Sequence, residues 1–152
     1  MPRTRTYRIT IPAATRYLTA VRRFVAIHAR EAGFSEAEID RIRLAVDEAC
    51  TNAIKHAYKG NERGLIDVII RVTPEKFHII VRDRGPGFNP SDYQAPDIRR
   101  SVRHRKGGGY GIHLMYSLMD EVYFRRKKRL NEVHLIKYRR PDTSRTSTRA
   151  HT

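Results

Sequence analysis

Apolar and polar positions alternate in three short segments of this chain, and each such segment predicts a β-strand. Two further short segments near the C-terminal end are also expected to be strands. The alternation is most regular in two neighbouring segments joined by the turn residues 73–76, so we expect a β-hairpin there. Asp83 directly follows the second hairpin strand, and the basic run 125–129 with Asn131 is expected to connect the last two strands. The expected strands lie at residues 7–11, 65–72, 77–82, 121–124 and 133–138.

Apolar residues recur with the helical period of about 3.6 residues in three other segments. The first begins after Pro12 and ends at Gly33. The second begins at Ser35, which forms a capping-box pattern with Glu38 three residues later. The third covers residues 110–119.

This order of elements predicts an α+β fold in two layers. We expect one mixed, mostly antiparallel sheet with the helices on one face. Residues 1–139 are expected to form a single domain, because a chain of 152 residues can bury one core. Residues from about 88 to 108 lack periodicity, which is typical of a lid or a disordered loop. The basic tail 140–152 is expected to be disordered.

The composition narrows the class of protein further. No run of eighteen apolar residues exists, so no membrane span is expected, and no apolar segment follows the first charged residues, so secretion is not expected. Cys50 is the only cysteine, which excludes an internal disulfide and fits a reduced cytoplasm. The helix pattern favours Cys50 as a small core residue rather than a nucleophile.

The chain carries a formal net charge of +15, which attracts polyanions such as nucleic acids, nucleotide phosphates or acidic proteins. Its basic residues cluster at 99–106 and 125–129. Both clusters suit phosphate contacts, but ordinary solvated loop charge is the favoured interpretation. Neither cluster contains interleaved aromatic residues, which makes nucleic-acid binding a minor alternative.

The second helix carries a candidate chemical site. Glu48 and Asn52 are four residues apart, so they lie one turn apart on the same helix face. A carboxylate at this position can accept a proton, and a carboxamide oxygen is a ligand that Mg²⁺ accepts. The alternative is an ordinary solvated helix edge, because such a pair is common by chance.

Two glycine clusters follow. In Asp83-x-Gly85-x-Gly87, the strand-end carboxylate can accept hydrogen bonds from the amino group of an adenine ring, and the glycines allow close approach of a flat ligand. A tight turn after a strand has the same composition. The cluster 107–111 opens a helix whose exposed N–H groups suit phosphate, although a hinge is the alternative. It is neither a Walker A motif nor a Rossmann fingerprint.

Four features follow one another along the chain: an acid on a helix, an amide on the same helix, the motif Asp-x-Gly-x-Gly and a later glycine-rich start of a helix. This order resembles the pattern of the GHKL ATPases with the Bergerat fold. The sequence Glu-Ala-Cys-Thr-Asn-Ala at 48–53, with His-Ala-Tyr at 56–58, is similar to the corresponding motif of the anti-sigma-factor serine-protein kinases of that group. The segment 109–122 resembles their second glycine box. The resemblance covers roughly residues 7–138.

The resemblance implies ATP and Mg²⁺ as cofactors and a role for each site residue. Glu48 would be the general base on a substrate serine, Asn52 would ligate Mg²⁺, and His56 would lie near the nucleotide. Asp83 would recognise the adenine base. The remaining nucleotide-binding positions would be Gly85, Gly87, Gly108, Gly109, Gly111 and Ile112.

The resemblance also implies partners. The protein would hold a sigma factor away from RNA polymerase and would phosphorylate a serine of an anti-anti-sigma protein of the STAS type. We further expect a cytoplasmic protein that pairs as a homodimer through the edge of its first strand. Neither a membrane nor a nucleic acid is an expected partner.

One position departs from the family pattern. Some of these kinases carry an arginine two residues before the Gly-x-Gly pair, where this chain has Gly107. Loss of a cation at the transition state lowers rates by on the order of 10³-fold. Arg103, Arg105 or Lys106 are candidate substitutes. An ATP-binding module that sequesters its partner without phosphoryl transfer therefore stays an alternative.

Overall fold

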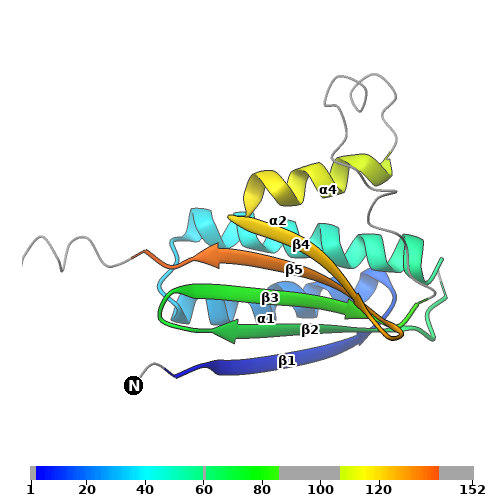
Figure 1. Cartoon of the computed structure of the whole chain (residues 1–152), viewed down its shortest axis with the longest axis horizontal. Helices are drawn as coiled ribbons and strands as arrows, with labels where there is room; N and C mark the ends of the chain where they lie inside the picture. Colours follow the sequence, from blue (N-terminus) through cyan, green and yellow to red (C-terminus); the bar gives the residue numbers. More distant parts are fainter. Residues whose placement is uncertain (1–2, 60, 86–106, 141–152) are drawn as a thin grey trace, which may run out of the picture.

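The computed structural model describes residues 3–59, 61–85 and 107–140. In this part of the chain, five strands form one sheet in the order β1-β2-β3-β5-β4, and helices pack on one face of it (Figure 1). The strands are β1 (Arg5–Pro12), β2 (Leu65–Val72), β3 (Lys76–Asp83), β4 (Glu121–Lys127) and β5 (Leu130–Tyr138). The α-helices are α1 (Leu18–Glu31), α2 (Glu36–Asn52) and α4 (Gly107–Leu118). The predicted α+β sandwich is confirmed, and every described strand pair is antiparallel.

The predicted hairpin is present as β2 and β3, which pair from Ile66 opposite Asp83 to Val72 opposite Phe77. Strand β1 pairs with the other side of β2 and forms one edge of the sheet. Strand β4 forms the opposite edge. The sheet therefore places β3 and β5 side by side near its centre.

The prediction for the last two strands was wrong in one respect. The basic residues 125–127 belong to β4 and Asn131 belongs to β5, so the two strands meet in a tight hairpin turn in which Lys128 has a φ of 57°. Polar residues can extend the ladder here because the backbone hydrogen bonds between strands do not depend on apolar alternation. Arg125 stands opposite Glu132 in this ladder, but the Glu132 carboxylate pairs with Arg82.

The first helix begins later than the sequence pattern predicts. Ala14 is extended, and a short 3-10 turn, η1 (Thr15–Tyr17), precedes α1. The second helix begins as predicted. The Glu38 N–H donates to Ser35 Oγ at 3.2 Å, and the Ser35 N–H donates to Glu38 Oε1 at 3.2 Å. This reciprocal pair satisfies two backbone donors at the start of α2.

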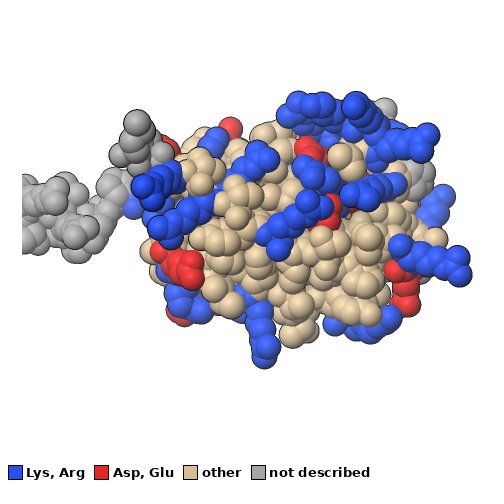
Figure 2. Space-filling view, turned by 90° about the horizontal axis from the view of Figure 1, so that it is seen from below, with Lys and Arg blue, Asp and Glu red and all other residues tan. Residues whose placement is uncertain are grey.

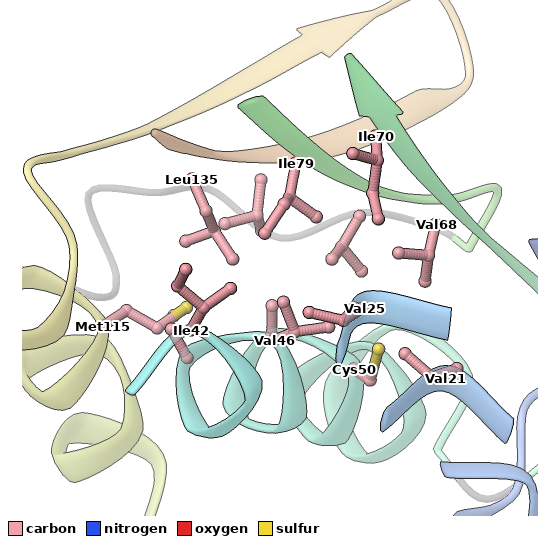
Figure 3. Packing of buried hydrophobic residues seen from close by; sticks show 14 of the residues in the cluster. Val21, Val25, Ile42, Val46, Cys50, Val68, Ile70, Ile79, Met115 and Leu135 are labelled. Carbon is pink, nitrogen blue, oxygen red and sulfur yellow. The ribbon is translucent and has the colours of Figure 1, made fainter. Parts of the chain in front are cut away.

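The core lies between the sheet and the helices. Figure 3 shows Val68, Ile70, Ile79 and Leu135 pointing from the strands toward Ile42, Val46, Cys50, Val21, Val25 and Met115 on the helices. Cys50 is fully buried, which confirms it as a core residue. Burial also raises the pKa of its thiol to about 12, so the reactive thiolate is suppressed.

The sheet face opposite the helices has a second set of buried residues: Ile69, Ile80, Ile136, His78 and His134. Nε2 of His78 and Nδ1 of His134 are 2.8 Å apart and link β3 to β5. Within the described residues, no helix is long and apolar enough to cross a bilayer.

Candidate functional site

The C-terminal half of α2 carries the predicted acid and amide. The apolar stripe of this helix is buried in the core, and Glu48 lies beside it, partly exposed. Asn52, one turn later, is only 7% exposed. After Asn52 the helix widens into a π-helical turn, η2 (Ala53–Ala57), which includes His56. Such turns change the direction of the side chains that follow and occur frequently at functional sites.

The environment of Glu48 makes it a stronger base than a free glutamate. Burial raises the pKa of its carboxyl group, the neighbouring Asp47 carboxylate adds to the increase, and the Lys55 ammonium opposes it. Asp47 is itself held by Arg22 on α1, whose Nε lies 3.0 and 2.9 Å from its two carboxylate oxygens. This ion pair fixes α1 against the turn of α2 that presents Glu48.

Asn52 is buried, and His56 is partly buried. The Asn52 carboxamide makes no hydrogen bond to another described residue, although it is almost fully buried. A buried amide usually has a partner, so a ligand at this position is consistent with its environment. Burial lowers the pKa of His56, and Lys55 lowers it further, so this imidazole is neutral at neutral pH.

Asp83, at the end of β3, is held by two hydrogen bonds to one carboxylate oxygen. Asn131 Nδ2 donates to Asp83 Oδ1 at 2.9 Å, and the Gly85 N–H donates to the same oxygen at 3.0 Å. Burial raises the pKa of Asp83, and both hydrogen bonds oppose that increase. Asp83 is 4% exposed, so its orientation is well defined.

Asn131 was not among the residues singled out from the sequence as part of the site. Its Nδ2 also donates to the Gly85 carbonyl at 3.2 Å, and its Oδ1 is buried without a hydrogen-bond partner among the described residues. From the sequence it is expected in the connection between the last strands. Only the register that pairs Asp83 with Asn131 brings the two side chains together.

The helix and the strand end meet at Gly85. A Cβ atom added there would lie 2.6 Å from the Ala57 carbonyl oxygen and 2.7 Å from the Ala57 Cβ, so only glycine fits without movement. Tyr58 strengthens the same junction, since its hydroxyl accepts from the Arg84 N–H and donates to the Leu65 carbonyl, both at 2.7 Å. The element carrying Glu48 and Asn52 is therefore joined directly to the loop after Asp83.

The third helix begins at the same end of the molecule. Figure 1 shows the start of α4, the C-terminal end of α2 and the C-terminal end of β3 together at one end. Gly108, Gly109 and Gly111 belong to the first turns of α4. Ile112 is 1% exposed and lies in the core, where α4 packs against α2. Gly107 and Gly108, expected at the end of the lid, are helical.

Several predicted residues lie outside the described residues. These are Gly87, the lid from 88 to 106, the candidate cations Arg103, Arg105 and Lys106, and most of the tail. Their expected roles stay predictions.

A resident metal centre made of protein carboxylates is not supported. Among the described residues, no group of three or more His, Cys, Asp or Glu side chains is placed to hold a metal ion. The buried Asn52 amide suits a Mg²⁺ ion whose other ligands are phosphate oxygens and water, which is the usual arrangement in phosphoryl-transfer sites.

The chain is similar to a family of ATPase domains and to serine-protein kinases. Residues 11–137 match the family model described as histidine kinase-like ATPase domain. The chain is 37% identical to the serine-protein kinase RsbW of Bacillus licheniformis over 117 residues, which is 73% of this chain and 72% of that protein. It is 34% identical to RsbW of Bacillus subtilis over 74% of this chain and 72% of that protein. It is 33% identical to RsbW of Staphylococcus aureus over 74% of each.

Two solved structures share the fold. The RsbU and RsbW domains of a Mycobacterium tuberculosis protein superpose with a TM-score of 0.63 at 20% identity, covering 90% of this chain and 33% of that one. The histidine kinase domain of a blue-light activated kinase from Erythrobacter litoralis superposes with a TM-score of 0.50 at 20% identity, covering 85% of this chain and 62% of that one.

Proposed function

Because the chain belongs to the histidine kinase-like ATPase family, and within it to the serine-protein kinases of the RsbW type, we propose that it is an anti-sigma factor and an ATP-dependent protein-serine kinase. Its partners are then a sigma factor, which it sequesters, and an anti-anti-sigma protein of the STAS type, whose serine it phosphorylates. Such partners place it in the cytoplasm.

In this proposal Glu48 is the general base. Its carboxylate accepts the proton of the substrate serine hydroxyl as the serine oxygen attacks the γ-phosphorus of ATP. The bond from that phosphorus to the β–γ bridging oxygen breaks, and ADP leaves. The raised pKa of Glu48 supports this role, because a base whose pKa lies closer to neutrality accepts a proton more readily. The Arg22–Asp47 ion pair keeps the neighbouring turn of the helix fixed while this happens.

The nucleotide is held by the other residues of the site. The fixed carboxylate of Asp83 accepts a hydrogen bond from the adenine amino group, and Gly85 lets the ring approach the backbone. Asn52 would hold a Mg²⁺ ion, which would neutralise phosphate charge. The first turns of α4 offer backbone N–H groups to the phosphates, as a helix N-terminus can.

One observation carries the proposal furthest. A buried aspartate, fixed by Asn131 and Gly85, lies at a junction that is joined through Ala57 to the helix bearing the acid and the amide. An aspartate that only stabilised a tight turn would not need to be buried. Nor would the following turn need to contact the backbone of a second element as closely as Gly85 contacts Ala57.

A phosphoryl-transfer assay tests the kinase. Purified protein, radiolabelled ATP and an anti-anti-sigma protein are combined, and the label on the substrate serine is followed. Glu48→Gln should reduce transfer by about 10²- to 10⁴-fold while ATP affinity stays within about twofold. Glu75→Gln, a change of the same kind on an exposed turn, is the control. Equal transfer by Glu48→Gln and wild type would rule out the base assignment.

A second candidate function deserves the same assay. Gly107 lies in the first turn of α4, at the position where some of these kinases have an arginine. An ATP-binding module that sequesters its partner without phosphoryl transfer follows if no other cation replaces that arginine. In that case wild type leaves the serine unlabelled although it binds ATP.

Nucleotide binding is measured separately by thermal unfolding with Mg²⁺ and ATP, or with Mg²⁺ and GTP. A ligand present at a hundred times its dissociation constant adds about 2.7 kcal/mol to the free energy of unfolding. We expect this stabilisation with ATP and not with GTP, because Asp83 accepts hydrogen bonds whereas guanine offers a carbonyl oxygen at the corresponding place. No stabilisation by ATP would refute both candidate functions.

Homodimer formation through β1 belongs to the same proposal. Strand β1 is an edge of the sheet, so one side of its backbone is not paired by another described strand. An edge strand of this kind can pair with a second copy. Sedimentation equilibrium of the full chain determines the oligomeric state, and a monomer at micromolar concentration would exclude this part.

A further inference from the structure

The open face of the sheet, opposite the helices, carries a basic groove that the nucleotide site does not use. The groove has a volume of about 400 Å³. It is lined by Arg71, Ile80, Arg82, Arg125, Lys127, Lys128, Leu130, Glu132 and His134. Residues 71, 82 and 125–128 are far apart in the sequence, and the register of the sheet brings them together.

The groove has a cationic wall with little acidic compensation. Glu132 is the one acid in its lining, and that carboxylate is already engaged by Arg82 at 2.7 Å and by His134 at 2.9 Å. Arg71, Arg125, Lys127 and Lys128 have no ion-pair partner among the described residues. Gathered like charges raise the free energy of the unbound protein and attract an acidic partner. Figure 2 shows a dense group of Lys and Arg side chains on the right, the side where the β4–β5 turn lies in Figure 1.

The lining of the groove also contains two apolar residues, Leu130 and Ile80. Leu130 is partly exposed, whereas Ile80 is only 1% exposed. A partner that fills this groove therefore needs acidic groups for the basic wall and at least one apolar group for Leu130. A polypeptide segment with both kinds of side chain meets these needs.

We propose that this groove, built from the outer faces of β2, β3, β4 and β5, binds an acidic segment of a partner protein that also carries apolar side chains. The inference does not rest on phosphoryl transfer, because the groove lies on the sheet face opposite to Asp83. Along β3, Ile80 and Arg82 face the groove, whereas the alternation turns Asp83 toward the helices.

Two other occupants fit less well. A nucleic acid would offer phosphates to the wall but no aliphatic group to Leu130. Tyr123 and Tyr138 are exposed aromatic residues of this face, but the Tyr123 ring already stacks on His134 at a centroid distance of 4.4 Å and the Tyr138 hydroxyl already donates to Glu121. A second copy of this chain would bring its own net charge of +15 against the same cations.

The test uses the full chain and a fluorescent synthetic peptide containing Glu, Asp and Leu. Arg71→Gln with Arg125→Gln removes two groove charges, and Arg23→Gln with Arg41→Gln removes two exposed charges from the helix layer. We expect the groove variant to bind the peptide at least about 10-fold more weakly, and the control variant to bind within about twofold of wild type. Replacing the Leu residues of the peptide by Ser should also weaken binding.

Location and integrity are checked in the same samples. The backbone amide signals of Ile80 and Arg82 should shift on titration with peptide, and both variants should keep the wild-type stabilisation by ATP. Equal losses of peptide affinity in the two variants would show that only net charge matters and would overturn the proposal.

Three other results would also overturn it. These are absence of peptide binding by the wild-type chain, tighter binding of an oligonucleotide of equal charge through the groove, and loss of self-association in the groove variant.

Discussion

Asn131 holds the carboxylate of Asp83 in one orientation, and this single amide shows how much of the site depends on individual hydrogen bonds. Its Nδ2 bridges Asp83 and the Gly85 carbonyl, while its Oδ1 has no hydrogen-bond partner among the described residues. The charged form of the Glu48 carboxyl is not stabilised in this way, because burial and the neighbouring acid make that form unfavourable. Each of these features has a measurable consequence.

Asn131→Ala should weaken ATP binding by about 10-fold or more, because a hydrogen bond to a charged group contributes about 1.5–3 kcal/mol. Calorimetric titration with Mg²⁺ and ATP measures the change. Asn61→Ala is the matched control, since the Asn61 side chain accepts a bond from the Arg63 N–H in an exposed turn. Wild-type affinity in Asn131→Ala would show that Asp83 needs no positioning.

Glu48→Gln should raise the free energy of unfolding at pH 7 relative to wild type. The folded-state pKa of Glu48 is raised, so the folded protein favours the protonated form. The stability that this protonation gives is complete below the unfolded-state pKa and is lost as pH rises through the folded-state pKa. The advantage of Glu48→Gln should therefore shrink toward pH 4. Urea unfolding across this range measures it, and an advantage that does not depend on pH would contradict the assignment of the shift.

At the scale of elements, the site depends on a contact between the end of α2 and the end of β3. The π-helical turn η2 brings Ala57 against Gly85, and Tyr58 ties the following loop to β2. The capping box at Ser35 fixes the other end of α2, so the register of Glu48 and Asn52 is determined along the whole helix.

Gly85→Ala should destabilise the protein by about 1–3 kcal/mol and weaken ATP binding, because the added methyl group overpacks the junction. Adding Ala57→Gly should restore only part of the loss. It removes the Cβ at 2.7 Å but leaves the carbonyl oxygen at 2.6 Å. Urea unfolding and ATP titration of the single and double variants measure both effects, and full recovery in the double variant would show that the backbone contact is unimportant.

At the scale of the whole molecule, the two faces of the sheet have different chemistry. One face packs against the helices and ends at the proposed nucleotide site, whereas the other carries the basic groove and the buried His78–His134 pair. The pKa of His78 is lowered to about 4, first by burial and then by His134 and the nearby Lys76 and Arg71. The central strands are therefore joined by neutral imidazoles.

Acid should destabilise the fold through this pair. Because the folded-state pKa of His78 lies below its ordinary value of 6.5, the unfolded chain binds more protons, and stability is lost as pH falls from 6.5 toward 4. The slope is at most about 1.4 kcal/mol per pH unit for one proton. His78→Gln should flatten it, whereas His113→Gln should not. Equal slopes in urea unfolding would place the acid sensitivity elsewhere.

The sequence alone determined the elements, the two-layer fold and the family, because hydrophobic periodicity and glycine spacing are local properties. The sequence also made Glu48, Asn52 and Asp83 candidates for the site, since each belongs to a local motif. Only the tertiary structure decided that Asn131 fixes Asp83, that Ala57 meets Gly85, and that Arg71 shares a groove with Arg125. These pairs depend on strand register and on a π-helical turn, which follow from packing across the whole molecule and leave no short-range pattern in the chain.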